Sequence, residues 1–175
     1  EDRRKSLADV RGTNPLSCEA DAAVIAAYLL RQYDPGPTRV LLSGGEPAQQ
    51  PLRLLVDALH DAGYQVHLET SGTATGHLGA SVDWICLSPK IGMPGGLSLA
   101  RAACEVADEL TWPIGKEKDL RQLRAFLVEM ALKPNCVVGI QPLSQNSKAT
   151  TLCIEACLRH GWRLSVQTHK YLELR

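Results

Sequence analysis

The sequence has no excess of either charge and no long apolar run. Lysine plus arginine and aspartate plus glutamate each number 19, so the formal net charge is zero. A chain without net positive charge has no general electrostatic attraction to nucleic acid or anionic lipid. No stretch approaches the roughly 18 apolar residues that a membrane-spanning helix requires. We therefore expect neither nucleic acid nor a membrane as a partner.

Signals for export are also lacking. The charged start, EDRRK, is followed by no apolar stretch, so no signal peptide is visible. A chain of 175 residues does not need disulfides for stability. We interpret its six cysteines as reduced thiols of a cytoplasmic protein, most of them in apolar segments such as residues 84–87: Cys18, Cys86, Cys104, Cys136, Cys153 and Cys157. The first residue is not methionine, and we expect the chain to start inside a longer protein.

Apolar periodicity predicts alternating strands and helices. Strands are expected at 40–42, 64–69, 83–87, 106–112, 136–140 and 163–167, the first of them a short apolar run interpreted as a buried strand. Helices are expected at 19–31, 51–62, 97–105, 119–132 and 147–160, the first of them largely buried because it is apolar nearly all round. This alternation predicts one α/β domain over residues 1–175 with parallel strands. Periodicity fits two architectures, an open doubly wound sheet and a full or partial β/α barrel.

Polar segments directly follow five of the predicted strands. They are residues 43–47 (SGGEP), 69–73 (ETSGT), 88–90 (SPK), 141–144 (QPLS) and 167–170 (QTHK). The carboxyl ends of parallel strands meet at one edge of a sheet or barrel. The alternative is that these loops are polar only because such loops usually are. Five polar segments together favour a polar ligand site at this edge.

Residues 44–47 (GGEP) give the clearest functional signal of these segments. Two glycines allow backbone conformations closed to other residues and a close approach to a ligand. Glu46 could accept charge-assisted hydrogen bonds from an ammonium group, or could be a solvated glutamate in a tight turn. The same choice applies to Lys90 and His169, which could be surface residues, and to Glu69, which could pair with a neighbouring basic group. Neither GxxxxGK[ST] nor GxGxxG is present.

Together these motifs resemble a known family. The GGEP segment resembles a motif of radical S-adenosylmethionine (SAM) enzymes. In order along the chain, SPK at 88–90, ADEL at 107–110, QPLS at 141–144 and VQTHK at 166–170 resemble 7-carboxy-7-deazaguanine synthase. The resemblance covers residue 38 to the end. Thr111 departs from it, since the family has a lysine there.

The resemblance implies a partial (β/α) barrel of the radical SAM type. Its cofactors are SAM, a [4Fe–4S] cluster held by three cysteines of a CxxxCxxC loop, and Mg²⁺. An external donor reduces the cluster, and SAM is split to a 5′-deoxyadenosyl radical. The radical acts on 6-carboxy-5,6,7,8-tetrahydropterin, which contracts to 7-carboxy-7-deazaguanine with loss of ammonia, in queuosine and deazapurine biosynthesis. The resemblance also implies a homodimer.

Residue roles carry over by position. The SAM-binding set implied by the resemblance is Gly44, Gly45, Glu46, Ser88, Pro89, Lys90, Gln141, Pro142, Leu143 and Ser144. The substrate-binding set is Ser43, Gln167, His169 and, through a terminal carboxylate, Arg175. No catalytic residue is identified in this chain.

The cysteine motif of the cluster is missing from the sequence. No CxxxCxxC occurs in it, and we expect the cluster loop and first barrel strand upstream of Glu1. Cys153, Cys157 and His160 lie on one helical face with a spacing that could bind metal, but their apolar neighbours favour a core-facing helix instead. Two other functions stay open: a non-catalytic SAM-binding module, and another radical SAM enzyme such as a glycyl-radical activase.

Overall fold

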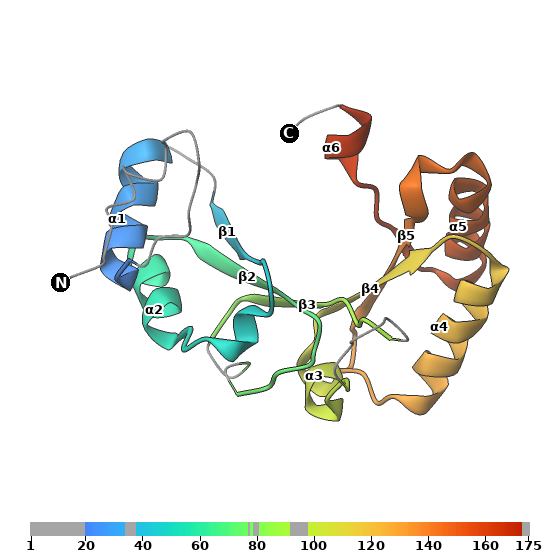
Figure 1. The fold of residues 1–175 in the computed structure, drawn as a ribbon, viewed down its shortest axis with the longest axis horizontal. Helices are drawn as coiled ribbons and strands as arrows, with labels where there is room; N and C mark the ends of the chain where they lie inside the picture. Colours follow the sequence, from blue (N-terminus) through green and yellow to red (C-terminus); the bar gives the residue numbers. More distant parts are fainter. Residues whose placement is uncertain (1–19, 34–37, 77, 79–80, 92–97, 173–175) are drawn as a thin grey trace.

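Six strands form one parallel sheet in the order of the sequence. The computed structural model describes residues 20–33, 38–76, 78, 81–91 and 98–172. The strands are β1 (Arg39–Leu42), β2 (Gln65–Thr70), β3 (Trp84–Leu87), β4 (Glu109–Ile114), β5 (Val137–Pro142) and β6 (Arg163–Leu164). The sheet is an open arc with β1 and β6 at its edges (Figure 1). The predicted fold class is confirmed as a partial β/α barrel.

Helices cover the outer side of this arc (Figure 1). They are α1 (Ala22–Tyr33), α2 (Arg53–Asp61), α3 (Arg101–Val106), α4 (Glu117–Glu129) and α5 (Ser147–His160). Short turns follow three strands: η2 (Pro47–Gln49), η3 (Leu143–Gln145) and the single-turn α6 (Thr168–Tyr171). Within the described part of the chain, no helix has both the length and the apolar character needed to cross a bilayer.

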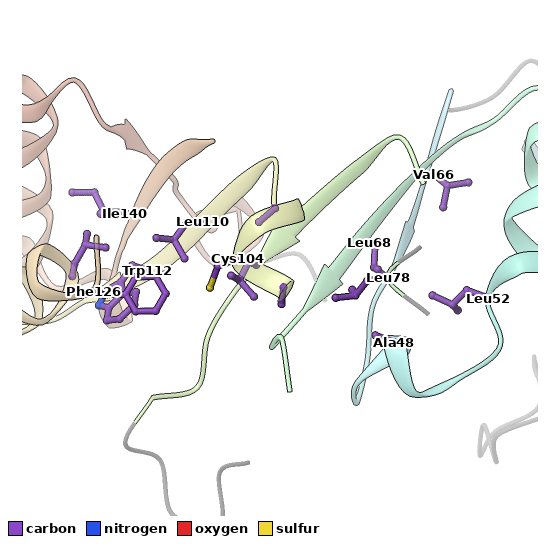
Figure 2. Close-up of a cluster of buried hydrophobic side chains, with 14 of the residues drawn as sticks. Ala48, Leu52, Val66, Leu68, Leu78, Cys104, Leu110, Trp112, Phe126 and Ile140 are labelled. Atoms are coloured by element: carbon purple, nitrogen blue, oxygen red, sulfur yellow. The ribbon is translucent and has the colours of Figure 1, made fainter. Parts of the chain in front are cut away.

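The core lies between the outer face of the sheet and these helices. Successive side chains of a strand point to opposite faces, and the outward set of Val66, Leu68, Leu110 and Ile140 is fully buried. Figure 2 shows these side chains as part of one apolar cluster that continues to the ring of Phe126 on α4. The inward set of the same strands includes most of their polar side chains, among them His67, Glu109 and Gln141. The sheet is therefore a scaffold with one structural face and one free face.

Capping residues set the boundaries of α4 and α5, the two long helices near β5. Asp119 accepts hydrogen bonds from the backbone N–H groups of Gly115 (2.8 Å) and Lys116 (2.9 Å), so α4 begins two residues before the predicted start. Asn146 accepts from Lys148 N (2.9 Å) at the start of α5, which ends at Gly161 in the left-handed conformation.

Three details of the sequence prediction are wrong. The helix α1 is not largely buried: of its side chains only Ala26 is, while Val24 and Tyr33 are 47% and 48% exposed. The apolar run of β1 is not buried: Val40 and Leu42 are partly buried on the core side, and Leu41 points to the free face and is 56% exposed. The last strand ends at Leu164, and the segment that follows it forms α6.

Two aspartates hold together the end of the sheet at which the strands begin, its amino-terminal edge. Asp83 Oδ2 accepts from Val66 N at 2.7 Å and lies 2.8 Å from His60 Nε2. Asp108 Oδ2 accepts from Ile85 N at 2.9 Å, while its other oxygen pairs with Lys133. Each aspartate thus supplies an acceptor for the N–H of the second residue of the neighbouring strand.

Candidate functional site

At the opposite edge, where the strands end, the carboxylate of Glu46 links the end of β1 to the end of β2. Its Oε1 accepts from Thr70 Oγ1 at 2.6 Å and from Ala48 N at 3.2 Å. Its Oε2 accepts from Ser71 N at 2.8 Å and from the Ser71 hydroxyl. The GGEP loop is therefore fastened to the neighbouring strand by a carboxylate that accepts four hydrogen bonds.

These hydrogen bonds keep Glu46 ionised. Partial burial would raise the pKa of Glu46, but hydrogen bonds from Ser71, Thr70 and Ala48 outweigh burial and hold the pKa below its usual value. All four donors are neutral, and no cation of the described residues pairs with Glu46. The negative charge is thus stabilised but not compensated.

The glycines of this edge have two different reasons for lacking a side chain. Gly44 and Gly45 have φ angles of 89° and 56°, yet no atom lies within 4 Å of the position that a Cβ would take, so the backbone conformation alone requires glycine there. Gly72 also has a positive φ, and its Cβ would lie 2.5 Å from Leu99 and 2.7 Å from Leu87. The sequence-based reason for the first pair, their backbone freedom, is confirmed.

The inner face of the arc forms a hollow of about 580 Å³. All six strands contribute to its lining: Arg39, Leu41, Gln65, His67, Glu69, Asp83, Trp84, Cys86, Glu109, Thr111, Gln141, Arg163 and Ser165. Its size and mixture of charged, aromatic and hydroxyl groups suit a small polar ligand. At the β1 end, Ser43 donates to Glu69 Oε2 at 3.2 Å, so Glu69 meets a hydroxyl and not the basic group considered from sequence.

Two carboxylates flank a thiol in the middle of this hollow. Cys86 lies in register with Glu69 on β2 and with Glu109 on β4. Burial, and then the charges of these carboxylates, raise the pKa of Cys86 to about 11, although its sulfur lies 3.3 Å from Thr111 Oγ1. The sequence places Cys86 in an apolar segment, but its side chain lies on the polar face because strand neighbours alternate.

Glu109 is oriented by its neighbours. Trp84 Nε1 donates to Glu109 Oε2 at 3.2 Å. The absent side chain of Gly139 leaves room for the other oxygen, which would lie 3.2 Å from a Cβ there. Thr111, which stands where the resembled family has lysine, also faces the hollow.

Lys90 lies in a second, smaller hollow of about 170 Å³. Pro89, Trp112 and Leu143 are among the residues that line it. Lys90 Nζ donates to Ser88 Oγ at 3.1 Å. Next to Leu143, Ser144 has a φ of 55°, a conformation that is rare for residues other than glycine and often occurs at ligand sites.

The predicted site residues therefore fall into separate groups along one edge. One group contains Ser43 and Glu46, and a second contains the residues around Lys90. Gln141 faces the main hollow, next to the buried Pro142 that ends β5. No described contact joins Glu46 to Lys90 or to Gln141. Gln167 precedes α6, which contains His169, and Arg175 lies outside the described residues.

Sequence reasoning missed the hydroxyls that hold Glu46. Thr70 and Ser71 belong to the ETSGT segment, which drew attention only through Glu69. It also missed Glu109 and Arg163, which line the hollow. The available signal was strand alternation: once the outward apolar positions of a strand are fixed, its remaining polar positions must face inward.

The described residues do not fit a [4Fe–4S] cluster. They contain no group of three histidine, cysteine or acidic side chains placed to hold a metal. Burial raises the pKa values of Cys104, Cys136, Cys153 and Cys157, which favours thiols over the thiolates that a cluster needs. His160, at the end of α5, stacks on Trp162 with a centroid distance of 4.5 Å. Cys18 lies outside the described residues.

Similar proteins identify the family. No family model matches the chain. The 7-carboxy-7-deazaguanine synthase of Escherichia coli K12 is 39% identical over 135 residues, which are 77% of this chain and 60% of that protein. The synthase of Caulobacter vibrioides is 36% identical over 160 residues, covering 89% of this chain and 69% of the relative.

Comparison with a solved structure indicates the same family. The crystal structure of QueE from Escherichia coli matches with a TM-score of 0.83 and 34% identity, over 95% of this chain and 74% of that one. A match over 95% of this chain includes most of the sheet that carries the GGEP edge and the hollow. On these identities and coverages, the chain belongs to the 7-carboxy-7-deazaguanine synthase family.

Proposed function

We propose that this chain forms the larger part of an enzyme that makes 7-carboxy-7-deazaguanine from 6-carboxy-5,6,7,8-tetrahydropterin with loss of ammonia. The observation that carries the proposal is the 36% identity to a synthase of that name over 89% of the chain. The aligned region spans only 60% of the length of the Escherichia coli synthase, so the activity of the whole protein is inferred from the relatives.

SAM fits the GGEP edge by the chemistry of its donors and acceptors. Glu46 offers an ionised carboxylate without a cationic partner, which suits the α-ammonium group of SAM. When bound in an enzyme of this family, SAM supplies the group that abstracts hydrogen from the substrate. The residues proposed to contact the rest of SAM are Gly44, Gly45, Ser88, Pro89, Lys90, Gln141, Pro142, Leu143 and Ser144.

The substrate belongs in the neighbouring hollow. Ser43 lies at its rim through its hydrogen bond to Glu69. Gln167, His169 and Arg175 are proposed to reach the substrate from the chain end. A pterin is flat and rich in N–H donors, and the hollow offers carboxylates and the stacked rings of His67 and Trp84, whose centroids are 6.1 Å apart.

Other parts of the proposal come from the resemblance alone. They are Mg²⁺, an external electron donor, a homodimer, a cytoplasmic location and a [4Fe–4S] cluster. Because the described cysteines do not fit the cluster, no step of the reaction is assigned to residues of this chain through it.

The test begins with the coding sequence upstream of Glu1, where the proposal expects a CxxxCxxC triplet. The complete gene product is then reconstituted with iron and sulfide without oxygen and supplied with reductant, Mg²⁺, SAM and the tetrahydropterin. Mass spectrometry should detect 7-carboxy-7-deazaguanine. A complete product that binds SAM but lacks the triplet and never cleaves SAM would instead be a SAM-binding module. Cleavage of SAM without this product would favour a different radical SAM enzyme.

A further inference from the structure

The hydroxyl of Ser71 lies between two possible hydrogen-bond acceptors. It donates to Glu46 Oε2, and its oxygen is 2.8 Å from Thr73 Oγ1. All three side chains are partly buried at the end of β2. In this arrangement Thr73 is the donor to Ser71, because the proton of Ser71 is used at Glu46.

The carboxylate of Glu46 has little acceptor capacity left. An ionised carboxylate has about four lone-pair directions, and four donors already occupy them. The N–H groups of Ala48 and Ser71 are fixed by the backbone. Thr70 is 3% exposed, and its hydroxyl is also held as the acceptor of Gly72 N at 3.0 Å.

Ser71 is therefore the donor that can leave at the smallest cost. Rotation about its Cβ–Oγ bond turns its proton away from Glu46 without moving the oxygen, and the oxygen of Thr73, 2.8 Å away, is close enough to receive it. The half-buried Thr73 can then donate its own proton to water. Every hydroxyl stays hydrogen-bonded in both arrangements, so the exchange leaves no buried donor unpaired.

We propose that Ser71 is an exchangeable placeholder at Glu46: its hydroxyl occupies the carboxylate until an ammonium group arrives, and then turns to Thr73. This inference rests on the proposed function, since it takes the α-ammonium group of SAM as the arriving donor. Ser71 is a positioning residue and touches no reacting atom. Its role is to keep the carboxylate hydrogen-bonded before SAM binds without blocking the SAM site.

The placeholder role of Ser71 predicts that removing its hydroxyl and removing that of Thr73 have opposite effects on SAM affinity. Calorimetric titration of the complete, reconstituted gene product with SAM at pH 7 would measure the dissociation constants. Ser71→Ala removes the competing donor and should tighten binding about threefold, within the range of one net hydrogen bond. Thr73→Val removes the acceptor to which Ser71 must turn and should weaken binding about fivefold. In the Ser71→Ala background, Thr73→Val should have no further effect.

Two further variants separate this role from a merely structural one. Ser71→Thr keeps the hydroxyl and should keep the wild-type affinity, and Ser147→Ala on the outer helix α5 is the matched control for loss of a serine hydroxyl. Thermal unfolding of each variant verifies that it is folded. A hydroxyl that only stabilised the loop would give weaker binding in both Ser71→Ala and Thr73→Val, with equal effects of Thr73→Val in either background, and this result would overturn the placeholder.

The two proposals fail in different ways. If the wild-type chain does not bind SAM at all, the proposed SAM site is wrong and the placeholder falls with it. If the wild type binds SAM and Ser71→Ala weakens binding or leaves it unchanged, the placeholder alone is wrong.

Discussion

The two edges of the sheet use carboxylates in opposite ways. At the amino-terminal edge, Asp83 and Asp108 each accept a hydrogen bond from a backbone N–H of a neighbouring strand. Each also contacts a basic side chain: His60 in the case of Asp83, and Lys133 in the case of Asp108. At the carboxyl-terminal edge, Glu46 accepts hydrogen bonds only from neutral donors. The geometry is similar, but only the carboxylates of the amino-terminal edge have a basic side chain among their partners.

This difference separates stability from function. A carboxylate that accepts a backbone N–H and also contacts a basic side chain has its partners within the protein, and it fastens two strands together. A carboxylate that is ionised without a cation is ready for a cation from outside the protein. We therefore propose that the amino-terminal edge serves folding and that the GGEP edge binds the ligand, as the corresponding edge does in other β/α barrels.

Removing the charge of Glu46 should have the largest effect on ligand binding. Glu46→Gln keeps the size of the side chain, but in either orientation its NH2 group faces a backbone N–H, that of Ala48 or that of Ser71, and the neutral amide cannot attract an ammonium group as a carboxylate does. A hydrogen bond to a charged group contributes about 1.5–3 kcal/mol, so we expect SAM affinity to fall by roughly 10- to 100-fold in calorimetric titration. The matched variant Asp83→Asn should bind SAM like the wild type, and equal losses in both would end the distinction between the edges.

Removing the charge of Asp83 should instead lower stability. In Asp83→Asn the amide oxygen would still offer one acceptor to Val66 N, but the hydrogen bond would no longer be charge-assisted. We expect this substitution to reduce the free energy of unfolding by about 1 kcal/mol, measured by urea denaturation at pH 7. Unchanged stability would show that Asp83 does not fasten β2 to β3.

The same aspartate predicts a dependence on acid. Hydrogen bonds from Val66 N and then His60 lower the pKa of Asp83 in the folded protein. Its contribution to stability is therefore complete above the unfolded pKa near 4 and is lost as the pH falls through the lower folded pKa. Urea midpoints measured between pH 6 and pH 3 should fall less steeply for Asp83→Asn than for the wild type. Parallel pH profiles would argue against the lowered pKa.

The exposed ion pair should contribute least. The side chain of Lys133 is 44% exposed, and such pairs typically contribute about 0–1 kcal/mol. Lys133→Met should therefore lower the free energy of unfolding by no more than about 1 kcal/mol, and less in 1 M salt than at low ionic strength. A larger loss would mean that Asp108 depends on its cation more than on Ile85 N.

The alternation of strands and helices and the apolar outer face could be predicted from sequence because they follow from local patterns. The order of the strands in the sheet could not be predicted from periodicity, which fits two architectures. Helix α2 shows this, since Leu52, Val56 and Leu59 repeat at helical spacing and are all buried. The boundaries of β4 could not be predicted. Pro113 suggests a strand end, but β3 pairs with β4 only at Glu109 and Leu110, so the far half of β4 tolerates a residue without an N–H.

The site itself could be predicted only as a set of loops. The sequence indicated that GGEP and ETSGT lie at the same edge, because the carboxyl ends of parallel strands meet there. The four donors to Glu46 depend on the side-chain rotamers of Thr70 and Ser71 and on the turn at Ala48, none of which has a sequence pattern. Cys86 shows the same limit, since its apolar neighbours concealed a side chain that faces the hollow.

The central claim is that the unpaired charge of Glu46 selects an ammonium group. The most direct test compares SAM with 5′-methylthioadenosine, which shares the nucleoside but has no amino-acid portion, as ligands of the wild type and of Glu46→Gln. Titration should show that the substitution weakens SAM binding at least about tenfold and leaves binding of 5′-methylthioadenosine unchanged. Equal losses for both ligands, or no loss for SAM, would contradict the account.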